Sequence, residues 1–391
     1  MIKSILAKID EAMSKERNSK QIFLLIVSVL VISRLLMYLT YIYWSHSIGF
    51  RNESIFQALF KWDAGWYQLI IEKGYNIEPR FHEASNAANW AFLPLVPMVM
   101  KALLKIIPLS LPAIAAIFNT IIFGGALFVF YKYVALTRKS NKSAILFVAL
   151  TAFGPYSFYY STIYTESCFL FFLGMSLYCL KKKKYILMGI FGALLSTTRN
   201  IGAFFVFVIL VDYIMEIVKT KDYSIKNIFN ILHRPKLALG TALCPLGIFV
   251  YMAYLGQLMG DPLAFLRIQI AWGVSADGGP FGLLLKAFTD VGSINFYYAL
   301  WAIWGLIMLY NSIKSKNWNE AILMAIFIFV PLSVRMQSLP RYLVCTGMLT
   351  LQFVDCIRDW KKDNKIILFV ILLIFENALL LAWFNLEQFV V

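Results

Sequence analysis

One carboxylate lies among aromatic rings in the segment KWDAGWY, residues 61–67. Asp63 has Trp62 before it and Trp66 and Tyr67 shortly after it. Aromatic neighbours remove water from a carboxylate, which raises its pKa toward the range in which a general base works. The same rings offer stacking faces for a sugar. The alternative is an aromatic belt at a membrane interface, in which the aspartate is incidental.

Further charged residues stand at the ends of apolar runs. Glu166 follows Tyr164 in TIYTES and begins such a run, so we expect it to face the protein interior, where it could hold a substrate hydroxyl, ligate a cation or pair with an arginine. Arg199 in STTRNIG and Arg341 in SLPRYL have no acidic neighbour in sequence. A guanidinium matches the oxygens of a phosphate, so each is a candidate phosphate ligand. Pairing of one of them with Glu166 or Asp63 is the alternative.

The segment GDPLAFLRIQIAWG at 260–273 is typical of a turn that leads into a helix. Asp261 is then either the N-cap of that helix or a polar group of the site. Gln269 and Trp272 are three residues apart, so they share a helical face and could contact a sugar.

Metal and nucleotide sites are weakly indicated at most. His46 and His82, with Glu83 beside His82, lack the spacing of helical metal ligands, although a divalent cation stays open. No P-loop or GxGxxG motif is present, so no nucleotide site is expected. The cysteines form no CxxC pair and are expected to be packing residues, at positions Cys168, Cys179, Cys244, Cys345 and Cys356.

The composition predicts that these residues are positioned by membrane-spanning helices. The chain of 391 residues is 60% hydrophobic and 15% charged, with a mean hydropathy of +0.71. Soluble proteins carry about 25% charged residues, and the apolar runs here repeatedly approach the ~20 residues that cross a bilayer. We therefore expect a single all-α, polytopic integral membrane domain over 1–391, in the cell membrane.

Positive charge is concentrated between the apolar runs. Of the 36 Lys and Arg, 23 lie in six short segments: 1–20, 138–142, 181–184, 219–236, 314–316 and 358–365. Such clusters beside span ends indicate the cytoplasmic side, and their distribution favours a membrane topology signal over nucleic-acid binding despite a net charge of +15. Anionic-lipid binding would be a secondary effect of the same charge.

Placing these six segments in the cytoplasm predicts about eleven spans, with the N-terminus inside and the C-terminus outside. The first span is expected to be uncleaved. The spans are expected near 21–44, 113–136, 144–161, 163–180, 185–198, 200–218, 237–256, 283–310, 320–336, 341–357 and 366–385. Two extracytoplasmic loops follow, 45–112 and 257–282.

Within the first loop, 90–107 is expected to lie in the interface, because Pro94, Pro97, Lys101 and Lys105 suit an interfacial helix better than a span.

This topology brings the uncommon polar residues of the apolar runs to one side. Ionisable groups at membrane depth are expensive and usually functional, so we expect them to line one outward-facing polar cavity. They are Asp63, Tyr164, Glu166, Arg199, Asp261, Gln269 and Arg341.

The order of several motifs resembles that of the PIG-V-like mannosyltransferases of the GT-C superfamily, over about residues 20 to 345. The segments are KWDAGWYQLIIEKGY, NWAFLPLVP, YTES, STTRNIG, GDPLAFLRIQIAWG and PRY, of which the first and fifth are the most specific. The resemblance implies an inverting transferase that takes a sugar from a polyprenyl-phosphate carrier on the extracytoplasmic side, with Asp63 in the position of the base. The chain is shorter than the GPI-anchor enzyme and lacks obvious luminal insertions, so it looks more like a bacterial member. The acceptor, a lipid or a glycan, and the exact sugar stay open.

Two other classes of membrane protein remain as alternatives: another lipid-linked transferase, or a transporter. A transporter also has polar groups at helix breaks, but it typically places them near the bilayer midplane and shows internal repeats. Here the predicted polar groups lie toward one outer face, beside a long first loop.

Overall fold

The computed structural model describes residues 16–48, 53–78, 80–82, 85–221, 233–273 and 279–390. Predictions that concern residues 1–15, Glu83, most of the basic segment 219–236 and part of the loop 257–282 lie outside the described residues. The described part is a helical membrane protein with one short antiparallel sheet, in which β1 (Arg80–His82) pairs with β2 (Ser85–Ala87).

Five helices of the described part are long and apolar enough to cross a membrane, and a bent pair makes a sixth candidate. The five are α2 (Ser19–Ile48), α6 (Leu111–Arg138), α10 (Phe205–Thr220, preceded by the 3-10 helix η3, Asn200–Phe204), α16 (Ile294–Lys314) and α20 (Lys362–Phe384). The bent pair is α12 (Pro235–Leu243) and α13 (Leu246–Met259), with a 43° bend. Pro245 explains this bend, because it offers no N–H to the helix.

Shorter helices occupy most of the remaining chain. Those between the long helices are α7 (Asn141–Phe153), η2 (Ser157–Ser161), α8 (Glu166–Lys181), α9 (Tyr185–Thr198), α15 (Gly279–Thr289), α17 (Trp318–Leu332), α18 (Leu339–Cys345) and α19 (Met348–Ile357). Those of the two predicted loops and the C-terminus are α3 (Ile55–Ala58), α4 (Ala64–Lys73), η1 (Asn89–Ala91), α5 (Leu95–Leu104), α14 (Ala264–Arg267), η5 (Ile268–Trp272) and η6 (Gln388–Val390).

Several predicted spans are broken inside the bundle. The predicted 144–161 ends its α-helix at Phe153, because Pro155 disfavours a helical conformation at Gly154. The predicted 341–357 is two helices joined at Gly347, whose φ of 75° ends the first of them. In the first loop, α5 has ten residues and is therefore about 15 Å long, half of the hydrocarbon thickness.

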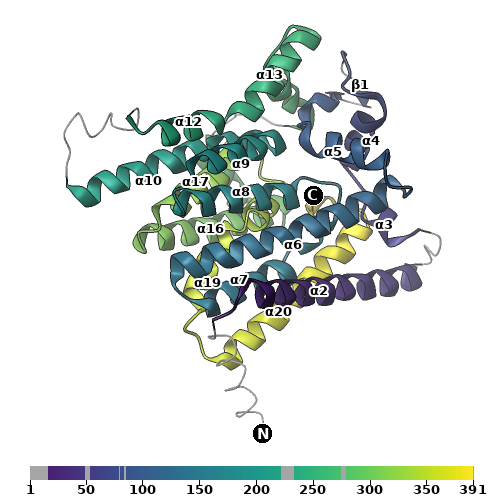
Figure 1. Ribbon diagram of the computed structural model, residues 1–391. Helices are drawn as coiled ribbons and strands as arrows, with labels where there is room; N and C mark the ends of the chain where they lie inside the picture. The colour runs from purple at the N-terminus through teal and green to yellow at the C-terminus, as the bar shows by residue number, and fades with distance from the viewer. Residues whose placement is uncertain are drawn as a thin grey trace.

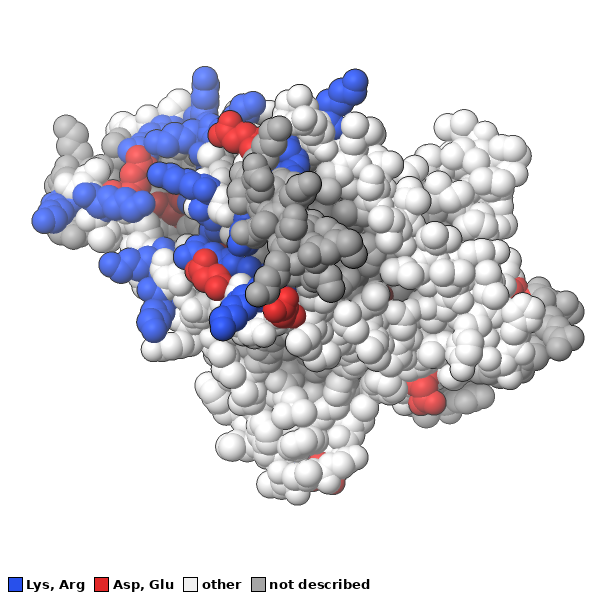
Figure 2. All heavy atoms as spheres, turned by 90° about the horizontal axis from the view of Figure 1, so that it is seen from below, with Lys and Arg blue, Asp and Glu red and all other residues white. Residues whose placement is uncertain are grey.

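The basic helix ends meet on one face of the bundle. Arg138 at the end of α6 donates to Glu320 of α17 at 2.7 Å and to Asp355 of α19 at 2.7 Å. Lys181 at the end of α8 lies 3.1 Å from Asp212 of α10. Figure 2 shows Lys and Arg gathered at one side of the molecule, and Figure 1 shows α3, α4 and α5 at the other end of the long helices.

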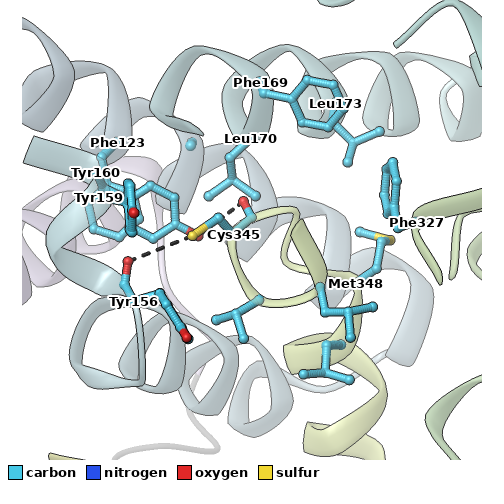
Figure 3. Packing of buried hydrophobic residues seen from close by; sticks show 14 of the residues in the cluster. Phe123, Tyr156, Tyr159, Tyr160, Phe169, Leu170, Leu173, Phe327, Cys345 and Met348 are labelled. Atoms are coloured by element: carbon cyan, nitrogen blue, oxygen red, sulfur yellow. Dashed lines mark hydrogen bonds between the residues drawn. The ribbon is translucent and has the colours of Figure 1, made fainter. Parts of the chain in front are cut away.

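The 3-10 helix η2 is fully buried, and its Tyr159 and Tyr160 pack among other buried side chains (Figure 3). The ring of Tyr160 stacks on Phe123 of α6 with centroids 4.0 Å apart. Its hydroxyl donates to the carbonyl of Cys345 in α18 at 3.1 Å, and the Cys345 thiol donates to the Tyr156 carbonyl at 3.7 Å. These contacts connect η2, which precedes Glu166 in the chain, to α18, which contains Arg341.

Candidate functional site

A fully buried carboxylate joins two arginines that are distant in sequence. Glu166 is the first residue of α8, and its side chain is inaccessible to solvent. Arg199, between α9 and η3, donates to Glu166 Oε1 and also, through Nε, to Thr165 Oγ1 at 2.6 Å. The Nε of Arg341 in α18 lies 3.3 Å from the same Oε1. Both arginines therefore pair with Glu166, where the sequence predicted a partner for one of them at most.

The cluster is enclosed, not open to solvent as the predicted polar cavity implied. The Arg199 and Arg341 side chains are 11% and 7% exposed. Charges at membrane depth are costly unless they are paired, and these three pair with one another in place of water. One positive charge remains in excess, and Glu166 Oε2 and Arg341 Nη1 have no hydrogen-bond partner among the described residues. Buried polar atoms of this kind suit a further polar group, such as a water molecule or a ligand oxygen.

Tyrosine rings orient both guanidinium groups. The centre of the Arg341 guanidinium lies 4.9 Å from the ring of Tyr159 and 5.4 Å from that of Tyr164. Arg199 lies 4.7 Å from the ring of Tyr342. Attraction between a cation and an aromatic face is strongest where water is excluded, so these rings help to hold the two charges in place.

Tyr164 links this cluster to the first loop. Its hydroxyl accepts a hydrogen bond from the Asp63 backbone N–H at 2.9 Å and donates to the Lys61 carbonyl at 3.1 Å. Between them, Trp62 has a φ of 56°, a strained conformation for a large side chain. Backbone strain of this kind persists where surrounding contacts impose it, and here the two hydrogen bonds of Tyr164 hold the backbone on either side of Trp62, directly before Asp63.

Asp63 itself stands at the N-terminus of α4, half-buried, and its carboxylate makes no hydrogen bond or ion pair within the described part of the chain. Burial raises the pKa of this carboxyl above its usual value. The positive charges of Arg341 and Arg335 oppose that rise, and the negative charge of Glu166 adds to it. Asp63 is thus a carboxylate of increased basicity within electrostatic reach of two arginines.

Three aromatic rings from separate motifs meet at Trp66, one helical turn beyond Asp63. The centroids of Trp66 and Phe92 are 6.2 Å apart in a stacked arrangement, and Trp272 lies 5.7 Å from Trp66 and 5.8 Å from Phe92. All three rings are partly exposed. Arg335 donates to the Trp272 carbonyl. The three rings form an aromatic platform of the kind on which a sugar ring stacks.

Two predicted site residues are engaged locally instead. Asp261 accepts from the Leu263 backbone N–H at 3.0 Å and pairs with Arg267 at 3.1 Å, and the N-cap position of α14 is Leu263. The N-cap prediction for Asp261 was therefore wrong: its carboxylate closes the turn before the helix. Gln269 donates to the Phe265 carbonyl of its own segment at 3.4 Å. Polar side chains on a short segment satisfy themselves with the nearest backbone groups.

The described residues do not provide a set of ligands for the divalent cation that the sequence left open. Within those ranges, no three His, Cys, Asp or Glu side chains gather as a metal site. His46 is exposed at the end of α2, and the His82 side chain is outside the described residues.

Sequence reasoning missed Tyr159, Thr165, Arg335 and Tyr342 as members of the site. Thr165 and Tyr342 are direct neighbours of predicted residues, so their position was a usable signal. Arg335 follows the apolar run of α17, and nothing in its local sequence indicates that it approaches Asp63.

Models of known protein families were compared with the chain and none matches, and no curated protein sequence matches it either.

Proposed function

We propose that the chain is an inverting membrane glycosyltransferase. It transfers a hexose, in line with the motif resemblance a mannose, from a polyprenyl-phosphate carrier to a lipid or glycan acceptor on the extracytoplasmic side. The observation that carries this proposal is Asp63, a half-buried carboxylate with a raised pKa and no partner among the described residues. It lies one helical turn before Trp66 of the aromatic platform and within electrostatic reach of Arg341 and Arg335.

In the proposed reaction, Asp63 takes the proton from the acceptor hydroxyl as its oxygen attacks the anomeric carbon of the sugar. The bond between that carbon and the phosphate oxygen breaks, and polyprenyl phosphate leaves with the electron pair. Attack on the face opposite to the leaving group inverts the anomeric centre. The aromatic platform of Trp66, Phe92 and Trp272 stacks the sugar, and positive charge stabilises the departing phosphate.

Arg335 is the arginine best suited to meet that phosphate directly, because its side chain is exposed whereas Arg199 and Arg341 are buried against Glu166. Arg199 and Arg341 carry two positive charges against the single negative charge of Glu166, and the remaining positive charge stabilises the phosphate from a distance. We expect Arg335→Gln to raise the KM for the donor on the order of tenfold or more, as loss of a charged hydrogen bond does. Arg267→Gln removes another exposed arginine, whose ion pair within the described residues is with Asp261, and it is the matched control. Equal KM values for both variants would contradict the role of Arg335.

The topology of the proposed enzyme follows from the basic face. We propose about eleven spans with this face in the cytoplasm, so that Asp63 lies outside. In a Cys356→Ser background, Gln68→Cys should react with a membrane-impermeant maleimide added to intact cells, and Lys316→Cys only after lysis. Both positions are exposed, on α4 and on the basic face respectively. The reverse pattern would mean that the site faces the cytoplasm.

The direct test supplies purified protein with radiolabelled polyprenyl-phosphate mannose and membrane acceptors. Covalent transfer of label to an acceptor, with an inverted linkage, supports the proposal. Absence of transfer from mannosyl and other hexosyl carriers, together with uptake of label into sealed proteoliposomes, would instead indicate a transporter.

A further inference from the structure

Two further buried ionisable residues lie away from the site. Arg34 is in the middle of α2 and Glu376 is in α20, and both helices are otherwise mostly apolar and face outward. Glu376 is 7% exposed. An ionisable group inside a membrane span is usually functional, yet within the described residues no hydrogen bond or ion pair joins either residue to Asp63, the aromatic platform or the Glu166 cluster.

Both charges hold the same short piece of backbone. Glu376 accepts from the backbone N–H groups of Ser157 at 3.2 Å and Phe158 at 2.9 Å, and from the Ser157 hydroxyl at 2.7 Å. Arg34 donates to the Ser157 carbonyl at 3.2 Å and to the Ser161 hydroxyl at 3.0 Å. The pair thus binds η2 at its beginning and at its end, from two different spans.

The backbone held in this way is under strain. Tyr156, directly before η2, has a φ of 63°, which a tyrosine adopts only when its surroundings impose it. The Glu376 carboxylate accepts from the Phe158 N–H at the start of η2 and shares the Ser157 N–H with the Gly154 carbonyl. Arg34 and Glu376 also border a cavity of about 20 Å³, room for one water molecule.

From η2 the contacts lead directly to the site. Tyr159, within η2, faces Arg341, and Tyr164, three residues beyond η2, holds the backbone of Asp63. We propose that Arg34 and Glu376 are positioning residues, a clamp that fixes η2 and thereby sets the positions of Tyr159, Tyr164 and Glu166. This role rests on the proposed function only in its consequence for catalysis; the clamp itself is testable without any substrate.

The buried thiol of Cys345 reports on the clamp, because it donates to the Tyr156 carbonyl and the Cys345 carbonyl accepts from the Tyr160 hydroxyl (Figure 3). Each cysteine's rate of alkylation by N-ethylmaleimide is measured by mass spectrometry in detergent. Exposed Cys356 confirms that the reagent is active, and buried Cys179 and Cys244 report the rest of the bundle. We expect Glu376→Gln to raise the rate at Cys345 on the order of tenfold or more. Both carboxyl oxygens of Glu376 accept hydrogen bonds from η2, and the amide keeps only one accepting oxygen, so the substitution favours local opening.

Asn377→Leu is the matched control, because Asn377 bonds α2 through Thr40 and its own helix through the Leu373 carbonyl, and within the described residues no hydrogen bond joins it to η2. It should leave Cys345 protected. Arg34→Met tests the other half of the clamp and should expose Cys345 as Glu376→Gln does. Unchanged protection of Cys345 in both clamp variants would overturn the proposal. Equal exposure of Cys179, Cys244 and Cys345 would also overturn it, because the pair would then support the whole bundle.

With an active transferase, Glu376→Gln should lower kcat with little change in the donor KM, because the clamp positions Tyr164 and Asp63 and leaves Arg335 in place. An equal rise in KM would contradict that consequence. If the native protein transfers no sugar at all, the proposed function fails, whereas the alkylation result still decides the clamp.

Discussion

Asp63→Asn is expected to lower the rate of sugar transfer by about 10²–10⁴-fold, the contribution of a positioned general base, without loss of folded protein. Asparagine has nearly the same shape and cannot accept the acceptor's proton. Burial raises the pKa of Asp63 in the folded protein, so at neutral pH its ionised form opposes folding. Removing the charge should therefore leave the melting temperature unchanged or higher. Transfer rate and thermal unfolding in detergent are measured together, and full activity of Asp63→Asn would remove Asp63 from the mechanism.

The pH dependence of the native enzyme follows from the same shift. Only ionised Asp63 accepts a proton, so the rate should rise with pH through the pKa of this group. Because that pKa is raised, the acidic limb of the kcat profile should lie above the pH range of an ordinary aspartate, near 4. A limb at or below that range would show that a different group carries the proton.

Glu166→Gln is expected to produce the largest loss of stability, about 3–5 kcal/mol, the cost of removing one partner from a buried ion pair. Arg199 and Arg341 would be left buried without a counter-charge. The amide keeps the size of the side chain and one hydrogen-bond acceptor, so the loss reports charge and not packing. Thermal and denaturant unfolding in detergent measure the effect.

Two further variants serve as a control and as a partial rescue. Asp261→Asn breaks the partly exposed pair with Arg267 and should cost at most about 1 kcal/mol. Adding Arg199→Met to Glu166→Gln removes one of the two unpaired cations and should recover part of the lost stability. A Glu166→Gln protein as stable as the native one would mean that this triad is solvated.

Much of the helical framework was predictable from local sequence. The predicted span 185–198 coincides with α9, and the predicted 113–136 lies inside α6. Apolar run length is a local property, because a helix satisfies its own backbone hydrogen bonds and the bilayer requires that it does. Pro155 and Pro245 also indicate helix breaks from the sequence alone. Whether a proline ends a helix or bends it, however, depends on the residues that pack around it.

Asp63 as the central candidate was also a sequence prediction, and Tyr164, Glu166, Arg199 and Arg341 were expected near it because charge pattern and helix count place their helix ends on one side. Which atoms pair was decided only by the tertiary structure. Both arginines pair with Glu166, and Asp261 forms an ion pair with Arg267. Arg34 and Glu376, which lie in otherwise apolar helices, hydrogen-bond to η2. Composition and periodicity act along the chain, whereas ion pairs and the raised pKa of Asp63 depend on distances of a few ångströms between residues far apart in it.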